Sequence, residues 1–177
     1  MIHRALALWL TLQLLLAMLS GGGNAASAAQ MPDDFNFTIH FGIDGKNCID
    51  TYNHTFTKDL IAKGTATIDF VIPADEMREI YRAFVEYQIA GLPYNMNIKP
   101  VIGGLYSSYE PAPTYAITCT CDQVTKTVIC DDGGPWDAVS GPPDTRDRLV
   151  SFIKIVEDYI YSTPDYQNMP PSEGGYD

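Results

Sequence analysis

The stretch "DFNFTIHFG", residues 34–42, decides the fold class of this chain. Its apolar residues alternate strictly with polar ones, and the apolar set is Phe35, Phe37, Ile39 and Phe41. A period of two residues is typical of a β-strand with one buried side. The chain is therefore expected to contain a sheet that is covered on this face.

Two more strands are predicted directly after this one. "CIDTYNHTFT", residues 48–57, is rich in threonine and aromatic residues, which favour strands. "GTATIDFVIP", residues 64–73, ends at a proline. The glycine-containing segment "GIDGKN", residues 42–47, is expected to be the turn that joins the first two strands.

The periodicity then becomes helical in two segments. In residues 74–93 the residues that recur at helical spacing are Met77, Ile80, Tyr81, Phe84, Val85 and Gln88, all apolar except the last. In residues 145–162 the apolar stripe consists of Leu149, Phe152, Ile153, Val156 and Ile160. A single stripe at helical spacing predicts a helix that packs on a sheet through one side.

Between the helices, "TYAITCTC" and "KTVICDD" are predicted to form a hairpin. The predicted order is thus β-β-β-α-β-β-α. Short links between strands favour antiparallel pairing. We expect an α+β fold with a largely antiparallel sheet of about five strands and two helices.

Three of the four cysteines lie on the predicted hairpin. A two-residue turn at Val124 and Thr125 places Cys119 opposite Cys130. Opposed Cβ atoms are about 4.5–5.5 Å apart and a disulfide needs about 3.5–4.5 Å, so a slightly closed pair could be bridged. This register favours a Cys119–Cys130 disulfide together with Cys48–Cys121.

A longer turn changes that pairing. With four residues in the turn, Cys119 faces Val128, and Cys121–Cys130 with Cys48–Cys119 becomes the alternative. In either case the oxidised protein is expected to have no free thiol. Zinc and redox chemistry are disfavoured, because C-x-C is not the redox C-x-x-C and only one close pair exists.

The N-terminal segment resembles a secretory signal. Arg4 precedes an apolar run over residues 5–19, and the small residues "ASA" at 26–28 follow. An apolar run of about 15 residues is shorter than the roughly 20 that a spanning helix needs. We expect a cleaved signal over residues 1–28, a single domain over 29–166 and a flexible tail over 167–177.

Removal of this segment leaves an acidic chain. The whole sequence has 22 acidic and 11 basic residues, and residues 1–28 contribute only Arg4, so the mature charge is −12. Such a charge disfavours binding to nucleic acid or anionic lipid. Without a second long apolar segment, we expect a secreted, extracellular protein with no stable membrane insertion, present as a monomer.

Signals for catalysis and metal binding are weak. The histidines that remain after cleavage, His40 and His54, are expected on strands and have no nucleophile in sequence context. Asp131, Asp132 and Asp137 could supply oxygen ligands to calcium, although acidic turns are far more often simply solvated. The sequence therefore nominates no catalytic residue, metal ligand or cofactor.

Two other surface features bear on function. Asn36 and Asn53 begin glycosylation sequons, and both are expected within strands. The irregular segment over residues 92–113 contains Tyr106 and Tyr109 among glycine, serine and asparagine, a composition typical of recognition surfaces. These tyrosines are the candidate binding surface, with packing in the core as the alternative.

Four stretches carry a resemblance to a known group. They are "FGIDGKNCIDTYNHTFTKDLI", "EMREIYRAF", "PAPTYAITC" and "YIYSTPDYQNMPPSEGGYD". In these the chain resembles small exported proteins of Gram-positive spore-forming bacteria, a group with no assigned activity. The resemblance implies export but no cofactor or functional residue. Many such proteins are lipid-anchored, whereas this chain has no cysteine at its cut site.

The sequence thus predicts a secreted, disulfide-stapled domain that binds an unknown extracellular partner and is not an enzyme. A small extracellular hydrolase or calcium-dependent protein is one alternative. An inhibitor that acts through residues 92–113 is another. A histidine within hydrogen-bond reach of a serine, cysteine or aspartate in a cleft would favour the hydrolase.

Overall fold

The computed structural model of the 177-residue chain describes residues 30–94, 101–102, 105–106, 111–131 and 144–176. The chain divides into residues 1–30, of which only Gln30 is described, and residues 31–177, which contain all the elements below. The predicted signal over residues 1–28 therefore lies outside the described residues.

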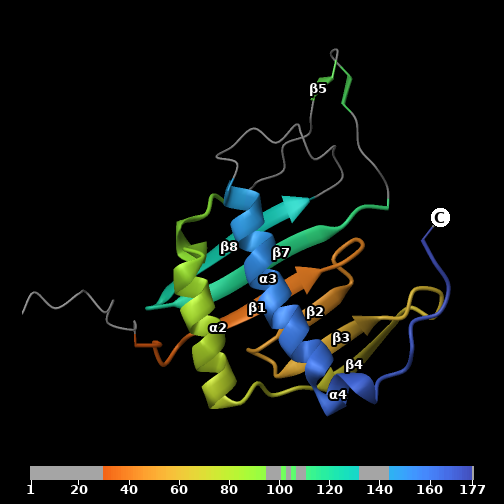
Figure 1. Cartoon of the computed structure of the whole chain (residues 1–177), viewed down its shortest axis with the longest axis horizontal. Coiled ribbons are helices and arrows are strands. Elements are labelled where there is room, and N and C mark those ends of the chain that lie inside the picture. The colour runs from red at the N-terminus through yellow and green to blue at the C-terminus, as the bar shows by residue number, and fades with distance from the viewer. Residues whose placement is uncertain (1–29, 95–100, 103–104, 107–110, 132–143, 177) are drawn as a thin grey trace, which may run out of the picture. The chain divides into compact units, whose positions relative to one another are not determined.

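A six-stranded antiparallel sheet forms the centre of this unit, with the strand order β4-β3-β2-β1-β7-β8 (Figure 1). The strands are β1 (Asn36–Phe41), β2 (Asn47–Asp50), β3 (Thr55–Asp59), β4 (Thr65–Asp69), β7 (Thr114–Cys121) and β8 (Val124–Asp131). The predicted α+β class with an antiparallel sheet is confirmed.

The stretch over residues 34–42 forms β1, one of the two central strands. It pairs with β2 on one side and β7 on the other. Phe37, Ile39 and Phe41 are buried on one face, as the alternation predicts. This strand joins the N-terminal and C-terminal halves of the sheet.

The predicted second strand is in fact two. Residues 51–54 form a turn that separates β2 from β3. Asp50 Oδ1 accepts hydrogen bonds from the backbone N–H groups of Tyr52 (2.9 Å) and Asn53 (3.1 Å). This local bonding competes with the extended strand that threonine and aromatic content suggested, so the sheet has six strands where about five were expected.

Two helices, α2 (Ala74–Glu86) and α3 (Asp144–Ser162), lie side by side on one face of the sheet (Figure 1). Every member of the predicted α3 stripe is buried. The α2 stripe is correct for Ile80, Tyr81 and Phe84, but Val85 is 43% exposed. Gln88 follows the helix in a left-handed conformation (φ 51°).

Shorter elements complete the unit. The 3-10 helix η1 (Ile89–Gly91) follows α2, and β5 (Val101–Ile102) pairs with β6 (Leu105–Tyr106) in a separate small sheet. The short helix α4 (Pro164–Gln167) follows α3. Thr163 caps α4, since its hydroxyl accepts a hydrogen bond from Tyr166 N–H.

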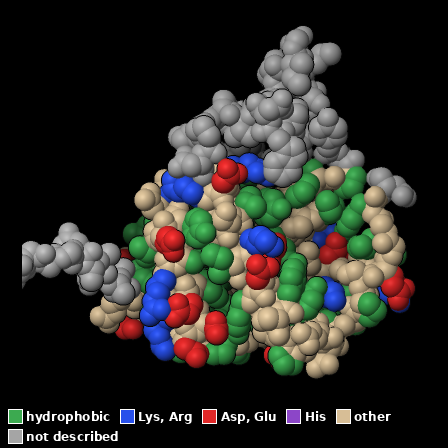
Figure 2. Space-filling model, viewed as in Figure 1, with side chains coloured by type: hydrophobic (Ala, Val, Ile, Leu, Met, Phe, Trp, Pro, Cys, Tyr) green, Lys and Arg blue, Asp and Glu red, His purple; other side chains and the backbone are tan. Residues whose placement is uncertain are grey.

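Threonines dominate the opposite face of the sheet, which we call the threonine face. Its members include Thr38, Thr55, Thr57, Thr65, Thr67, Thr118, Thr120, Thr125 and Thr127. Three cross-strand pairs bond through their hydroxyl oxygens at 2.8–2.9 Å. Both long helices cover the other face of the sheet. Seen from the helix side in Figure 2, the surface of the molecule mixes acidic, basic and apolar side chains.

Candidate functional site

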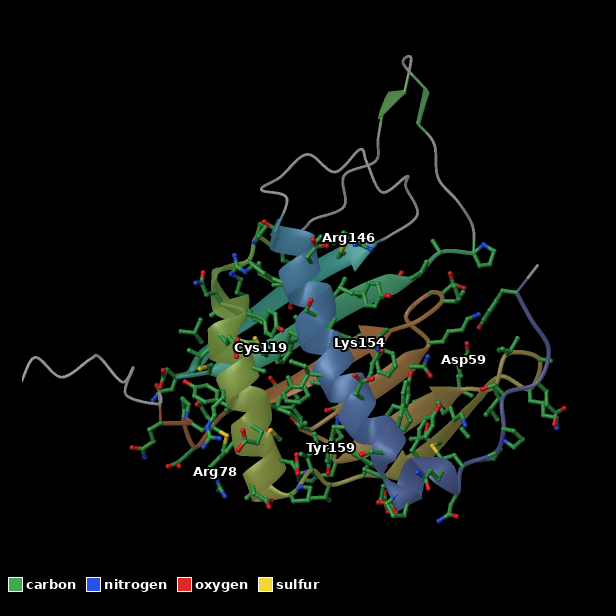
Figure 3. All side chains as sticks on the ribbon, in the orientation of Figure 1. Asp59, Arg78, Cys119, Arg146, Lys154 and Tyr159 are labelled. Carbon is green, nitrogen blue, oxygen red and sulfur yellow. The ribbon has the colours of Figure 1, made fainter. Side chains whose placement is uncertain are left out.

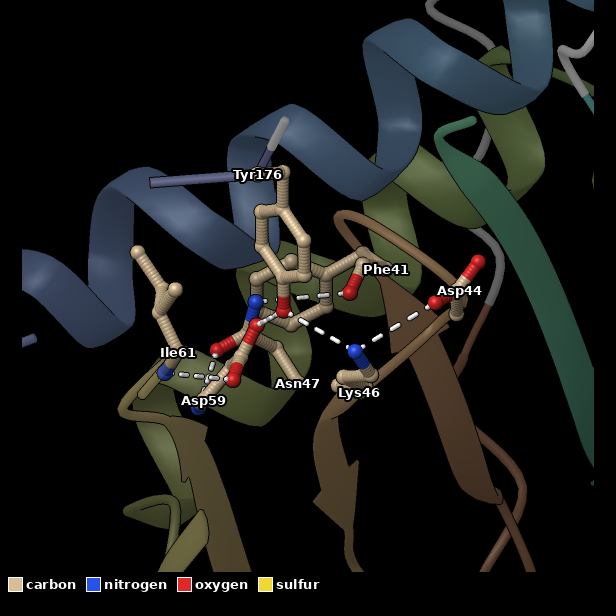
Figure 4. Close-up of polar contacts among 7 residues, drawn as sticks. All are labelled: Phe41, Asp44, Lys46, Asn47, Asp59, Ile61 and Tyr176. Atoms are coloured by element: carbon tan, nitrogen blue, oxygen red, sulfur yellow. Dashed lines mark hydrogen bonds and ion pairs between the residues drawn. The ribbon is translucent and has the colours of Figure 1, made fainter. Parts of the chain in front are cut away.

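A pocket of about 240 Å³ opens where β2 and β3 approach α3, α4 and the C-terminal segment. The lining residues that matter chemically are Asn47, Lys58, Asp59, Tyr161, Tyr166 and Tyr176. In Figure 3, Asp59 lies beside the C-terminal segment, and Figure 4 shows its contacts. None of these six residues was predicted as a site residue from the sequence.

Lys58 is a charged residue at a core position. It follows Phe56 by two residues on β3, so its side chain is directed to the same, helix-covered face. Only 9% of Lys58 is exposed. Its Nζ lies 4.5 Å from the centre of the Tyr166 ring, a cation–π contact. Among the described residues it forms no ion pair.

Tyr161 and Tyr166 form an aromatic wall of the pocket, with ring centres 4.7 Å apart. Burial, followed by the charge of Glu157, raises the pKa of both hydroxyls. They therefore stay protonated at neutral pH. Neither hydroxyl bonds to a described residue, so both remain available as donors.

Asp59 is fixed at the end of β3. It is 8% exposed, and its Oδ1 accepts a hydrogen bond from Ile61 N–H at 2.8 Å. Its Oδ2 accepts one from the Tyr176 hydroxyl. Its own backbone N–H donates to Asn47 Oδ1 at 2.9 Å. A buried carboxylate with these partners organises the site and has little freedom to bind a ligand.

The C-terminal segment lines one side of the pocket through Ser172 and Tyr176, and Figure 4 shows Tyr176 beside Asp59 and Lys46. Ser172 Oγ donates to the Asp59 carbonyl at 2.6 Å, and Glu173 forms a parallel bridge with Ile61. The Tyr176 hydroxyl accepts from Lys46 Nζ at 3.1 Å, and this bond to Tyr176 is the main reason that the pKa of Lys46 is raised. The prediction of a flexible tail over 167–177 does not anticipate these contacts.

The pocket thus presents the Lys58 ammonium, which has no ion pair among the described residues, and the hydroxyl donors of Tyr161 and Tyr166. Those groups can neutralise and hydrogen-bond a negative charge. The aromatic rings supply apolar contact area. The carboxylate of Asp59 also lines the pocket and is held by hydrogen bonds from Ile61 and Tyr176. This arrangement is suited to binding.

The predicted disulfides are not formed, and none of the four cysteines is disulfide-bonded. The hairpin turn lies at Asp122 and Gln123, so Cys119 pairs with Lys126 and Cys130 pairs with Tyr115. Cys119 and Cys130 are therefore four positions out of register, roughly 13 Å along the strands. The register predicted from a turn at Val124 and Thr125 is wrong.

The other predicted partner, Cys48, is on the wrong face. Cys119 is the register partner of buried Phe37 and faces the helices. Cys121 shares that face and contacts Tyr81. Cys48 pairs with exposed His40 and lies on the threonine face. A disulfide from Cys48 to either cysteine would have to cross the sheet, which its geometry does not allow.

The histidine criterion for a hydrolase is met only in part. His40 is exposed on β1, as expected, and its Nε2 lies 3.7 Å from Cys48 Sγ. Burial, followed by the charge of Asp50, raises the pKa of the Cys48 thiol to about 11, which disfavours the nucleophilic thiolate. The pair also lies on the sheet face and not in the pocket. His54 is in the β2–β3 turn and not on a strand.

The predicted binding tyrosines and calcium ligands have side chains that the structure does not describe. Tyr106 is in β6, but its side chain is not described, and Tyr109, Asp132 and Asp137 lie outside the described residues. Asp131 ends β8, and its side chain is likewise not described.

The two sequons differ in setting. Asn36 is half-buried in β1, as expected, where its amide donates to the Asp34 carbonyl. Asn53 lies in the exposed β2–β3 turn and not in a strand. Its amide donates to Asp50 Oδ2 at 2.7 Å.

No described helix has both the length and the apolar content needed to cross a membrane. Within the described ranges, no cluster of three or more His, Cys, Asp or Glu side chains is placed to hold a metal ion. No protein-family model, curated protein or solved structure matches the chain.

Proposed function

We propose that this chain is an exported, non-enzymatic binding protein whose pocket at Lys58 takes a small molecule carrying an anionic group. The observation that carries the proposal is the buried Lys58 ammonium, which lines the pocket and has no ion-pair partner among the described residues. A buried charge without a counter-ion is costly. A ligand that brings a carboxylate or phosphate would supply the missing negative charge.

The pocket chemistry supports the same ligand class. The hydroxyls of Tyr161 and Tyr166 can donate hydrogen bonds to the anionic group, and their rings can pack on its carbon skeleton. The size of about 240 Å³ suits a compact organic acid or acidic sugar. Glu157, whose charge raises the pKa of both tyrosines, disfavours a second anionic group beside them. One negative charge next to Lys58 is thus the best fit.

Export is proposed from the sequence, because residues 1–28 have the layout of a secretory signal. Binding is preferred over hydrolysis because Cys48 and His40 lie outside the pocket lining, and the raised pKa of Cys48 disfavours the thiolate.

The test is titration of the purified protein with lactate, glucuronate and inorganic phosphate by calorimetry. We expect at least one probe to bind with 1:1 stoichiometry, and Lys58→Met to weaken that binding by about 10-fold to 100-fold. A hydrogen bond to a charged group contributes about 1.5–3 kcal/mol, which corresponds to that range.

Lys154→Met is the matched control, because Lys154 is an exposed lysine on the outer side of α3 (Figure 3) and does not line the pocket. It should bind each probe as the unchanged protein does. Circular dichroism must show that both variants are folded. Absence of binding by every probe, or equal affinity in Lys58→Met, contradicts the proposal.

A further inference from the structure

His40 and Cys48 bring a nitrogen and a sulfur donor together on the threonine face. They are direct register partners on the antiparallel strands β1 and β2. His40 Nε2 and Cys48 Sγ lie 3.7 Å apart. His40 is exposed and Cys48 is half-buried, so the pair is accessible from solvent. Neither residue lines the pocket, so this site does not depend on the proposed function.

A backbone carbonyl fixes the orientation of the histidine. His40 Nδ1 lies 3.1 Å from the carbonyl oxygen of Gly45. A carbonyl can only accept, so Nδ1 must carry the proton and Nε2 presents its lone pair toward Cys48. Metal-binding histidines are commonly oriented by this second hydrogen bond.

Glycine is the favoured residue at position 45 of this turn. Gly45 has φ +63°, and an added Cβ would lie 3.3 Å from the His40 Cβ. A larger residue would be strained in this conformation and would press on the histidine. The turn between β1 and β2 thus holds the imidazole in place.

The spacing of the two donor atoms is suitable for a shared metal ion. An ion bound to sulfur at about 2.3 Å and to nitrogen at about 2.0–2.1 Å holds the two about 3.5 Å apart at a tetrahedral angle and about 4.3 Å apart at a linear one. The observed 3.7 Å lies between these limits. A bent arrangement fits this separation as it stands, and a linear two-ligand ion needs the two donor atoms to move apart by about 0.6 Å.

We propose that Cys48 and His40 bind a copper(I) ion. On binding, the S–H proton of Cys48 leaves to solvent as the metal–sulfur bond forms, and Nε2 donates its lone pair without losing a proton. Thiolate is a ligand that selects copper(I), and imidazole also suits copper. Two ligands are sufficient for copper(I), whereas zinc usually takes at least three from the protein. The described residues offer no third ligand in a cluster.

The test is anaerobic titration with copper(I) against a chromophoric copper(I) chelator, in the presence of a reductant. We expect Cys48→Ser to lose one bound equivalent relative to the unchanged protein. His40→Asn should weaken that equivalent by at least 10-fold while keeping the thiol. Silver(I), which does not change oxidation state, should shift the imidazole NMR signals of His40 at one equivalent.

Two variants serve as controls. Cys121→Ser removes a half-buried thiol on the helix-covered face, and His54→Asn removes the histidine of the β2–β3 turn. Both should retain the equivalent that Cys48→Ser loses. The proposal is overturned if His40→Asn binds as tightly as the unchanged protein, because the thiol would then act alone. It is also overturned if the imidazole signals do not move.

Discussion

At the residue scale, Lys58 is the side chain whose placement is hardest to explain by folding alone. It lies two residues after buried Phe56 on β3, so its side chain is on the helix-covered face of the sheet. Its cation–π contact with Tyr166 offsets only part of the cost of burying an ammonium that has no ion pair within the described ranges. A residue that lowers stability and lines a pocket is the kind that function retains.

This argument predicts that Lys58→Met stabilises the protein in the absence of ligand. Methionine keeps an unbranched apolar stem, in a side chain one atom shorter than that of lysine, while removing the desolvated charge. We expect the free energy of unfolding in urea to rise by about 1 kcal/mol, since the lost cation–π contact offsets part of the gain. Lys154→Met, which removes an exposed pair with Asp158, should change it by less than about 0.5 kcal/mol. A marked loss of stability in Lys58→Met would show that its ammonium is satisfied within the fold.

Two lining residues of the pocket, Lys58 and Tyr176, differ in whether the sequence could have predicted their place in it. The place of Lys58 could be predicted locally, because the alternation that begins at Thr55 puts Lys58 on the same face of β3 as buried Phe56. The place of Tyr176 could not. It bonds to Asp59 across 117 positions of sequence, and its segment consists of proline, glycine and polar residues that are typical of loose tails. Only tertiary structure brings them together.

At the element scale, the β7–β8 hairpin shows how a turn sets the register. Asp122 and Gln123 both have positive φ, at 52° and 63°, as in a type I′ turn. The Asp34 carboxylate accepts hydrogen bonds from both of their N–H groups, at 3.0 and 2.6 Å. The sequence supplies no glycine at this point, and the anchoring carboxylate is distant in the chain. The strands were therefore predictable, while their register was not.

Gln123→Gly is expected to stabilise the hairpin. Glycine adopts positive φ without steric cost and is the preferred second residue of a type I′ turn. The free energy of unfolding should rise by about 0.5–1 kcal/mol, measured by urea denaturation. Thr125→Gly is the control, because Thr125 lies in β8 and pairs with Thr120, and its loss should destabilise the protein. If Gln123→Gly instead lowered stability, the turn at Val124 and Thr125 would have to be reconsidered.

At the scale of the whole molecule, one core serves both helices and the sheet. The ring of Phe35 contacts those of Tyr81 and Phe84 on α2. Phe84 in turn contacts Phe152 on α3. A second set joins Phe41 and Phe56 to the tyrosines of the pocket. Because the pocket wall is continuous with the core, groups that titrate there affect the stability of the entire unit.

Alkaline pH should therefore destabilise the molecule in a defined way. Burial raises the pKa of Cys119 from 9.0 to about 11, and burial with the nearby Glu157 raises that of Tyr161 above its ordinary 10.0. A raised pKa means that the unfolded state releases its proton first. Stability is thus complete below about pH 9 and falls as pH rises toward and beyond 11.

The Tyr161 contribution can be isolated with Tyr161→Phe. The ring and its packing remain, and the hydroxyl bonds to no described residue, so stability at pH 7 should be nearly unchanged. At pH 11 the unchanged protein should have lost about 1 kcal/mol through this residue, after allowance for the 39% of it that is exposed. Tyr161→Phe should lose that much less between pH 9 and 11. Urea midpoints measured with reductant at pH 7, 9, 10 and 11 give the comparison. Parallel curves for the two proteins would mean that Tyr161 is as solvated in the folded state as in the unfolded one, and that the aromatic wall of the pocket is open.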